Sequence, residues 1–354
     1  MDYKIIDLLK ETVRQNASDL HISVGRPPTL RIDDILQPVA EGAKALDEKQ
    51  AEVLTLDLLA EQQQEKIIKE REVDFAYSLE GQHRFRVNAY FQQDTYAAAL
   101  RLIPGKVKTF AELGLPEILG EFAKSQQGLF LAVGPAGHGK STSIAAMIDW
   151  INHNRTDHII TIEDPIEYVF EQDKCLIDQR EVARDTVTFA KALRSSLRQD
   201  PDVVFVGELR DLETISTALT LAETGHLVIS TLHTNNATQT IDRLIDVFPA
   251  HQQGQVRSQV ASALIGIVSQ RLLPQIGGGR VVAAEILKSV PSVRNIIREG
   301  KVYQMNNVIQ TSVEEGMIPL DTSLARLVKE KKVKKEDALA HVIDDKNFEV
   351  AFNR

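Results

Sequence analysis

The sequence predicts an α/β protein in two parts, an N-terminal α+β domain and a second domain with a mostly parallel sheet. Three observations support this prediction. Period-two alternation of apolar residues recurs in several short segments of the first hundred residues, which is typical of an antiparallel sheet. From about residue 112, strand-like apolar runs alternate with helical periodicity. A glycine-rich phosphate-loop motif joins one such strand to the next helix. We expect domains at residues 1–104 and 112–354, with a linker at 105–111.

The N-terminal part is expected to open with a helix whose apolar side carries Ile5, Ile6, Leu9 and Val13. Short strands follow at residues 20–24 and 30–32, and then a second helix over roughly residues 47–69. Residues 73–79 and 85–91 alternate in hydrophobicity around a turn at residues 80–82, which predicts a hairpin. Residues 96–103 add a further strand, and the polar stretch after Pro104 is expected to be the linker.

The second part is expected to place four buried strands at residues 129–133, 158–162, 203–206 and 227–230. After the first strand, the apolar residues fall on one stripe of a helix, namely Ile144, Met147, Ile148 and Ile151. A helix over 211–223 is expected to start at an Asp211 N-cap and to end before Gly225. The last 80 residues are expected to be mainly helical, with a glycine loop at 277–279 and a short strand at 280–286. The lysine-rich run 329–335 is expected to be a solvated helix face.

Composition limits the classes of function. The chain has 354 residues and 43% hydrophobic content, enough for two cores, and its formal charge of −9 gives no basic field for nucleic acid. Its one cysteine, Cys175, excludes a disulfide framework and a multi-cysteine zinc site. The amphipathic N-terminus differs from a signal peptide, and the longest apolar run, 260–268, is too short to span a bilayer. We therefore expect a cytoplasmic protein with no direct membrane insertion.

The phosphate-loop motif carries the strongest functional signal. Its glycines let backbone N–H groups turn toward phosphate oxygens, and the helix behind it presents its positive end. Lys140 would neutralise the β- and γ-phosphates of a nucleotide, and Ser141 would hold Mg²⁺. The expected nucleotide-binding residues are Gly134, Pro135, Ala136, Gly137, His138, Gly139, Lys140, Ser141 and Thr142.

Acidic side chains follow two of the other predicted strands. Because parallel strands end at one edge of a sheet, Lys140, Glu163, Glu208 and His233 should approach one rim. ATP hydrolysis uses one acid to order Mg²⁺ or its waters and another to orient or deprotonate the attacking water. The alternative for either acid is an N-cap or surface carboxylate.

Histidines and arginines supply further candidates. His226 and His233 flank the fourth strand, where they could sense the γ-phosphate or remain structural. An arginine supplied across a subunit boundary would favour phosphoryl transfer. Spacing alone does not choose among the candidate arginines, which are Arg84, Arg86, Arg101, Arg194, Arg198 and Arg210. Arg194 and Arg198 are also spaced for one exposed helix face.

Taken together, these motifs resemble those of the type IV pilus retraction ATPases, within the superfamily of type II and type IV secretion ATPases. The markers run along the whole chain: ASDLH at residues 17–21, RFRVN at 84–88, the phosphate loop, IEDPIEY at 162–168, DPDVVFVGELRD at 200–211, AETGHLVISTLHT at 222–234 and SVRNIIRE at 292–299. The combination is far more specific than the phosphate loop alone, which indicates only an NTPase.

The resemblance implies a fold and a set of roles. The fold is a PAS-like domain joined to a RecA-like domain, assembled as a homo-hexamer. Glu163 matches the acid that acts on the attacking water, and Glu208 matches the Walker B acid that holds Mg²⁺ through water. His226 and His233 match the two histidines of the histidine box, and Arg86 and Arg101 match arginines directed at nucleotide from a neighbouring subunit. Arg210 is a further candidate for such a contact.

Two departures from the family pattern stand out. Ala136 and His138 replace the usual Thr and Ser of the phosphate loop, and we expect His138 to face solvent. In the retraction-specific motif near the C-terminus, Ser292, Val293 and Ile296 stand in place of the usual small and aliphatic residues. These replacements keep the amphipathic pattern of the motif, whose expected functional residues are Arg294, Asn295, Ile297, Arg298 and Glu299.

The sequence therefore predicts an ATPase with ATP and Mg²⁺ as cofactors that powers pilus retraction through an inner-membrane platform protein. Three alternatives stay open. They are an accessory retraction paralogue, a motor for pilus extension or type II secretion, and a non-hydrolysing nucleotide-gated scaffold. A small-molecule kinase is disfavoured, because the sequence shows no lid or acceptor-site signature. The single cysteine argues against the extension and secretion motors, which often carry a four-cysteine zinc element. The two acids argue against the scaffold.

Overall fold

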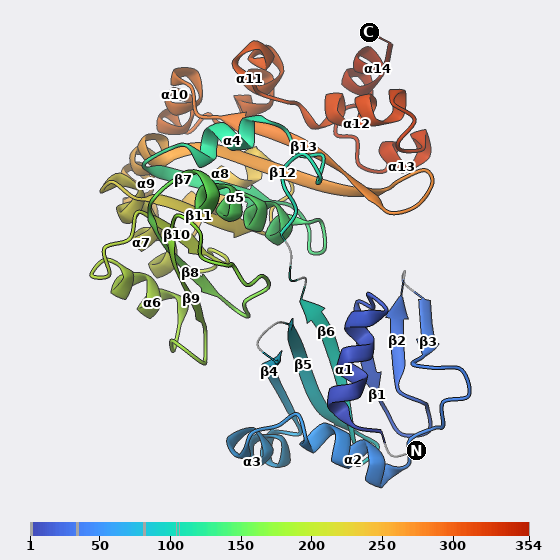
Figure 1. Cartoon of the computed structure of the whole chain (residues 1–354). Helices are drawn as coiled ribbons and strands as arrows, with labels where there is room; N and C mark the ends of the chain where they lie inside the picture. The colour runs from blue at the N-terminus through green and yellow to red at the C-terminus, as the bar shows by residue number, and fades with distance from the viewer. Residues whose placement is uncertain (1–2, 33–34, 81–82, 104, 106, 354) are drawn as a thin grey trace. The chain divides into compact units, whose positions relative to one another are not determined.

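The computed structural model describes residues 3–32, 35–80, 83–103, 105 and 107–353. The chain divides into two compact units, a smaller one made of Met1–Lys106 and Glu167–Val169 and a larger one made of Val107–Ile166 and Phe170–Arg354 (Figure 1). Gly81 and Gln82 of the expected turn lie outside the described residues, as do Pro104 and Lys106 of the expected linker.

The smaller unit is built on a six-stranded antiparallel sheet with the order β3-β2-β1-β6-β5-β4. Its strands are β1 (Asp19–Ile22), β2 (Thr29–Ile32), β3 (Ile35–Pro38), β4 (Glu72–Leu79), β5 (His83–Gln92) and β6 (Thr95–Ile103). Its helices are α1 (Ile5–Arg14), α2 (Glu48–Leu56) and α3 (Glu61–Glu70).

Apolar residues from one face of this sheet pack against α1 and α2. Leu9 and Leu54 of the helices join Leu20, Leu100 and Phe85 of the strands in one buried cluster. The alternation of β5 is confirmed, because Phe85, Val87 and Ala89 are all buried. The expected apolar side of α1 is partly wrong. Ile6 is exposed and Leu8 takes its place in the core.

The expected single helix at 47–69 is also wrong, because the chain forms two helices there. The first ends with Asp57 as its C-cap, and the second starts after Ala60, whose backbone N–H donates to the Gln63 side chain at 2.8 Å. Between them Leu58 and Leu59 are buried. Burial of these two leucines against the sheet outweighs continuation of the helix.

The larger unit is built on a seven-stranded sheet with the order β13-β12-β7-β11-β10-β8-β9. Its pairs are parallel except for β12 with β13. The strands are β7 (Gly128–Val133), β8 (His158–Glu163), β9 (Leu176–Glu181), β10 (Val203–Val206), β11 (Leu227–Leu232), β12 (Leu264–Pro274) and β13 (Arg280–Lys288). The helices are α4 (Ile118–Ala123), α5 (Lys140–Asn154), α6 (Phe189–Ser196), α7 (Leu212–Glu223), α8 (Ala237–Asp246), α9 (Ala250–Ala263), α10 (Pro291–Glu299), α11 (Met305–Thr311), α12 (Leu320–Lys329), α13 (Lys335–Leu339) and α14 (Asp345–Asn353), with 3₁₀ turns at Val302–Gln304 and Val313–Glu315.

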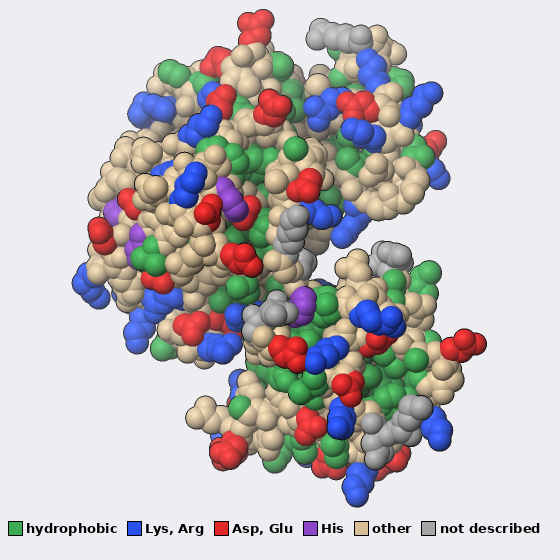
Figure 2. All heavy atoms as spheres, in the orientation of Figure 1, with side chains coloured by type: hydrophobic (Ala, Val, Ile, Leu, Met, Phe, Trp, Pro, Cys, Tyr) green, Lys and Arg blue, Asp and Glu red, His purple; other side chains and the backbone are tan. Residues whose placement is uncertain are grey.

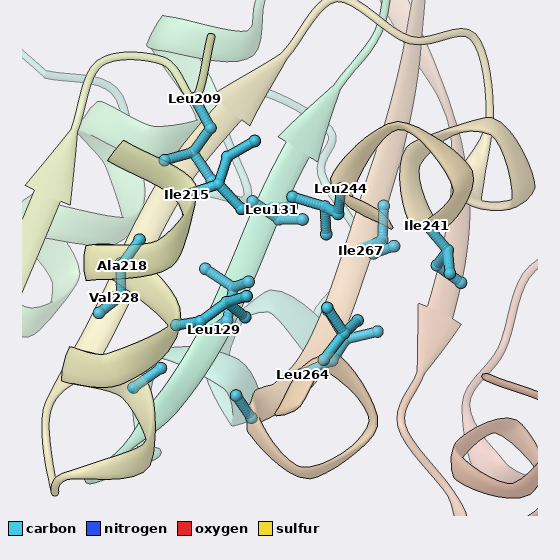
Figure 3. Close-up of a cluster of buried hydrophobic side chains, with 14 of the residues drawn as sticks. Leu129, Leu131, Leu209, Ile215, Ala218, Val228, Ile241, Leu244, Leu264 and Ile267 are labelled. Carbon is cyan, nitrogen blue, oxygen red and sulfur yellow. The ribbon is translucent and has the colours of Figure 1, made fainter. Parts of the chain in front are cut away.

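Both faces of this sheet are buried. Leu129 and Leu131 of β7 point into a cluster formed with α7, α8 and β12 (Figure 3). Phe130 and Ala132 point to the other face, where α4 and α5 cover them. This burial on both sides explains why the parallel strands are apolar throughout. The four strands expected from the sequence are confirmed, and so is the α7 N-cap, where the Asp211 side chain accepts from Thr214 N at 2.9 Å.

The region after residue 260 differs from the expectation. The apolar run 260–268 is split between the end of α9 and the start of β12, an eleven-residue strand that the sequence did not predict. A Cβ at Gly266 would lie 2.5 Å from the Phe122 ring, so this glycine lets α4 approach the strand. The expected strand at 280–286 is confirmed as part of β13.

Two expectations about charged helix faces are wrong. The lysine run 329–335 lies between α12 and α13 as a turn, because α12 ends at Lys329. Arg198 lies beyond the end of α6, so Arg194 and Arg198 share no helix face, and Arg194 pairs with Glu213.

Acidic and basic side chains are interspersed over the face drawn in Figure 2, with no extended region of one sign. Within the described ranges, no helix combines the length and apolar content needed to cross a membrane.

Candidate functional site

The phosphate loop connects β7 to α5, as the sequence predicts. Gly134 has φ +143°, and a Cβ there would lie 2.7 Å from the Gln270 carbonyl oxygen. Gly139 has φ +83° and forms the N-cap of α5. Only glycine fits both positions, because one has no room for a side chain and the other takes the left-handed backbone conformation. Ala136 and Gly137 are exposed, and Ser141 and Thr142 lie half-buried in the first turn of α5.

Lys140 folds back over this loop. Its side chain is buried, and Nζ donates to the carbonyl oxygens of Gly134 at 2.8 Å and Pro135 at 2.9 Å. Nζ also lies 3.5 Å from His233 Nδ1. The ammonium group is thus held at the mouth of the loop, where it can be transferred from carbonyls to phosphate oxygens.

Glu208, Arg210 and His233 meet beside the lysine. The Glu208 carboxylate, 15% exposed, forms an ion pair with Arg210 and lies 3.7 Å from His233 Nε2. This ion pair raises the pKa of Arg210. Burial, together with Lys140, lowers the pKa of His233, which favours the neutral imidazole. The structure therefore brings Lys140, His233, Glu208 and Arg210 into one chain of contacts.

Glu163 ends β8 at the same rim. It is buried, and its Oε1 accepts from Thr161 Oγ1 at 2.7 Å and Gln179 Nε2 at 3.4 Å. Glu181 of β9 is its neighbour in register and is also buried. Sequence reasoning missed Gln179 and Glu181, because β9 lacks the apolar pattern that predicted the other strands. It also missed Thr161, which lies within the predicted strand β8.

His226 does not join this group within the chain. It precedes β11, whereas His233 follows it, so the strand separates them by about 20 Å. His226 Nδ1 lies 3.0 Å from the Leu221 carbonyl oxygen. The two expected sensors therefore lie at opposite ends of the central strand β11.

His138 is half-buried and contacts β12, whereas the sequence analysis expected it to face solvent. Its Nδ1 accepts a hydrogen bond from Leu272 N of β12 at 3.0 Å, and its ring meets the His341 ring edge-on. No sequence pattern predicted this contact, since β12 itself was not predicted.

Strands β12 and β13 hold the loop that carries His233. The Asn235 carbonyl oxygen accepts from Ser269 Oγ at 2.9 Å and Arg271 Nη2 at 2.8 Å. Ala237 N donates to Glu285 Oε1 at 2.9 Å. Burial raises the pKa of Glu285 to about 7. Sequence reasoning missed this buried polar network as well.

The two arginines of the smaller unit are cross-strand neighbours, Arg86 on β5 and Arg101 on β6. Both are exposed, and Arg101 Nε pairs with Asp19 Oδ1 at 2.9 Å. Arg31 Nε lies 3.8 Å from the same carboxylate and was not predicted.

Helix α10 carries the C-terminal motif. Val293 and Ile297 are buried, whereas Arg294, Asn295, Arg298 and Glu299 are exposed. Arg294 Nη2 donates to the Ser289 carbonyl oxygen at 3.3 Å. The amphipathic pattern expected from the sequence is present.

Comparisons with known proteins agree with this geometry. The family model for type II/IV secretion system proteins matches residues 3–279. The type IV pilus retraction ATPase PilT of Pseudomonas aeruginosa is 47% identical over 344 residues, covering 97% of this chain and 99% of PilT. The type IV pilus ATPase PilU of the same organism is 42% identical, covering 94% of this chain and 87% of PilU. A crystal structure of the pilus retraction motor PilT with bound ADP matches with a TM-score of 0.92 and 45% identity, covering 98% of this chain and 99% of that one. This chain therefore belongs to the type II/IV secretion system protein family and, within it, to the PilT family of type IV pilus retraction ATPases.

Proposed function

We propose that this chain is a Mg²⁺-dependent ATPase that works as a homo-hexameric motor for type IV pilus retraction. The observation that carries the proposal is the contact chain from the buried Lys140 through His233 to Glu208 at the phosphate loop. The full-length similarity to PilT supports the biological setting. Residues 1–104 would form a PAS-like domain, 105–111 a linker and 112–354 a RecA-like domain.

The residues at the rim suit hydrolysis of ATP to ADP and phosphate. The N–H groups of residues 134–142 and the Lys140 ammonium would bind the β- and γ-phosphates. Glu163, oriented by Thr161 and Gln179, would position the attacking water and accept its proton. His233 would contact the γ-phosphate and report its loss.

The donor set also fits Mg²⁺, which prefers hydroxyl, carboxylate and water oxygens. Ser141 would be a ligand, and Glu208 would act through water after parting from Arg210. Bound Mg²⁺ would neutralise charge that develops on the phosphate oxygens.

Arg86, Arg101 and Arg210 would supply positive charge to nucleotide from a neighbouring subunit, which a closed ring of identical subunits makes available. We assign His226 to trans contacts as well, since its place in the fold keeps it away from the phosphate loop of its own chain. The exposed residues of α10 would face the inner-membrane platform protein, with the motor on the cytoplasmic side, peripheral to the membrane. No nucleic-acid partner and no membrane insertion are proposed.

Steady-state ATP hydrolysis with Mg²⁺ tests the proposal, with wild type beside Lys140→Ala and Glu208→Ala and oligomer size measured on the same samples. We expect turnover by wild-type rings and its loss in both variants, with circular dichroism spectra unchanged. ATP binding and ring formation without turnover would favour the scaffold or the accessory paralogue instead.

A further inference from the structure

The His138 side chain connects the phosphate loop to β12 at a point where the sheet itself no longer does. Strand β12 pairs with β7 only as far as Ser269, which lies opposite Val133. Beyond that pair, β7 turns into the phosphate loop and β12 continues to Pro274. The Leu272 N–H therefore donates to His138 Nδ1, at 3.0 Å, instead of to a carbonyl of β7.

Residues 270–272 of β12 form the back wall of the loop. A Cβ at Gly134 would lie 2.7 Å from the Gln270 carbonyl oxygen, and one at Gly139 would lie 3.3 Å from Leu272 Cδ1. The loop thus touches β12 near both of its ends, and His138 supplies the hydrogen bond between those two contacts. A shift of the loop relative to β12 would break this bond and leave a half-buried N–H group without a partner.

The hydrogen bond requires a neutral ring with its proton on Nε2, since Nδ1 is the acceptor. Burial lowers the pKa of His138, and the charged or titratable groups around it add to this effect. These groups are Lys140 on α5, Arg271 on β12, Arg280 on β13 and His341 after α13. All of them are cationic or neutral, so they disfavour a second proton on the ring.

We propose that His138 is a positioning residue for nucleotide binding, which holds the phosphate loop in register with β12 before the nucleotide arrives. The inference rests on the proposed nucleotide-binding function and deepens it. A loop held in place in advance loses less conformational entropy when its N–H groups close on phosphate. The expected consequence is tighter nucleotide binding, whereas turnover at saturation should change little.

Two variants of matched shape test this role. His138→Asn keeps a hydrogen-bond acceptor at the δ1 position. His138→Leu has a side chain of nearly the same shape as asparagine but has no acceptor. Affinity for a fluorescent ADP analogue with Mg²⁺, and KM and kcat for ATP, would be measured for each. We expect His138→Leu to weaken binding by about tenfold and to raise KM similarly, because the half-buried Leu272 N–H group loses its partner. His138→Asn should stay within about threefold of wild type.

Several results would overturn the inference. Wild-type affinity in His138→Leu would mean that the loop needs no such anchor. An equal loss of nucleotide affinity in His138→Asn and His138→Leu would show that the imidazole ring itself is needed, for example for a direct contact with phosphate. His341→Ala serves as control, since it removes the neighbouring ring and keeps the hydrogen bond, and should bind as wild type. His138→Ala is the second acceptor-free variant if the leucine fails to fold. Absence of nucleotide binding by wild type would instead refute the proposed function, and this inference with it.

Discussion

The rim of the larger sheet and the arginine-bearing face of the smaller sheet present charge in different ways. At the rim, Lys140 is buried and held by two carbonyl oxygens, and Glu163 is buried under two donors. On the smaller sheet, Arg86 and Arg101 are exposed on the face opposite the apolar cluster. Charges fixed in a protein interior act strongly, whereas exposed charges are screened by salt. We therefore expect the rim residues to act on a nucleotide bound to their own chain. We expect the exposed arginines to act only when a neighbouring subunit places its nucleotide beside them.

The largest effect should come from Lys140→Ala. The variant removes the ammonium group held at the mouth of the loop, so we expect turnover to fall by at least about 10³-fold and ATP affinity by about tenfold or more. Steady-state kinetics and nucleotide titration would measure both. Lys191→Ala, at a position on the exposed side of α6, is the matched control and should behave as wild type. Substantial turnover in Lys140→Ala would show that the residues at the rim are not the catalytic site.

The two acids should separate binding from hydrolysis. Glu163→Gln and Glu208→Gln keep the size of the side chain and lose its basicity, so we expect turnover to fall by about 10²–10⁴-fold while ATP still binds. Single-turnover hydrolysis would be compared with binding of a non-hydrolysable ATP analogue. Glu181→Gln, the buried neighbour in register with Glu163, should cost far less. If Glu181→Gln had the larger effect, the assignment of the catalytic base would move to β9.

The contribution of Arg86 and Arg101 to turnover should depend on ring assembly and on salt concentration. Arg86→Ala and Arg101→Ala should lower turnover by about 10²-fold in assembled rings, the usual cost of losing one charge donor to the transition state. Nucleotide affinity of isolated subunits should remain near that of wild type. Mixed rings of Arg101→Ala and Lys140→Ala subunits would test the origin of the charge. Recovery of activity at mixed interfaces is expected, and no recovery would argue that the arginines act within their own chain.

The elements that form the rim were predicted from the sequence more successfully than strand β12, for a physical reason. The phosphate loop, β8, β10 and β11 are specified by local patterns, namely glycine positions and short apolar runs. The strand β12 follows α9 directly, with no turn residue to mark the boundary, and its contacts with Phe122 and β13 decide its conformation. The partner of His138 lies 134 residues away along the chain, so no local signal could reveal it. Partners of buried polar groups are set by tertiary structure, and a single sequence does not record them.

The smallest effect on turnover should come from substitution of Glu285. This substitution tests whether the contact between Glu285 and Ala237 N stabilises the loop that carries His233. The pKa of this carboxyl is raised by burial to about 7, against 4.5 for the free group. Between these values the folded protein keeps a proton that the unfolded chain releases, so stability should fall as pH rises from about 4.5 to 7. The loss amounts to about 3 kcal/mol over that window.

Glu285→Gln cannot titrate, and its amide oxygen can still accept from Ala237 N. Its melting temperature should therefore depend less on pH than that of wild type, with the two curves converging toward low pH and the variant a few degrees higher at neutral pH. Thermal melts of both proteins between pH 5 and 8 would measure the difference, which cancels the contribution of all other titrating groups. Parallel curves would show that Glu285 is ionised throughout, paired with Arg271. In that case a buried ion pair between Glu285 and Arg271 would hold the loop that carries His233. Turnover of Glu285→Gln should then fall, because the substitution removes this ion pair.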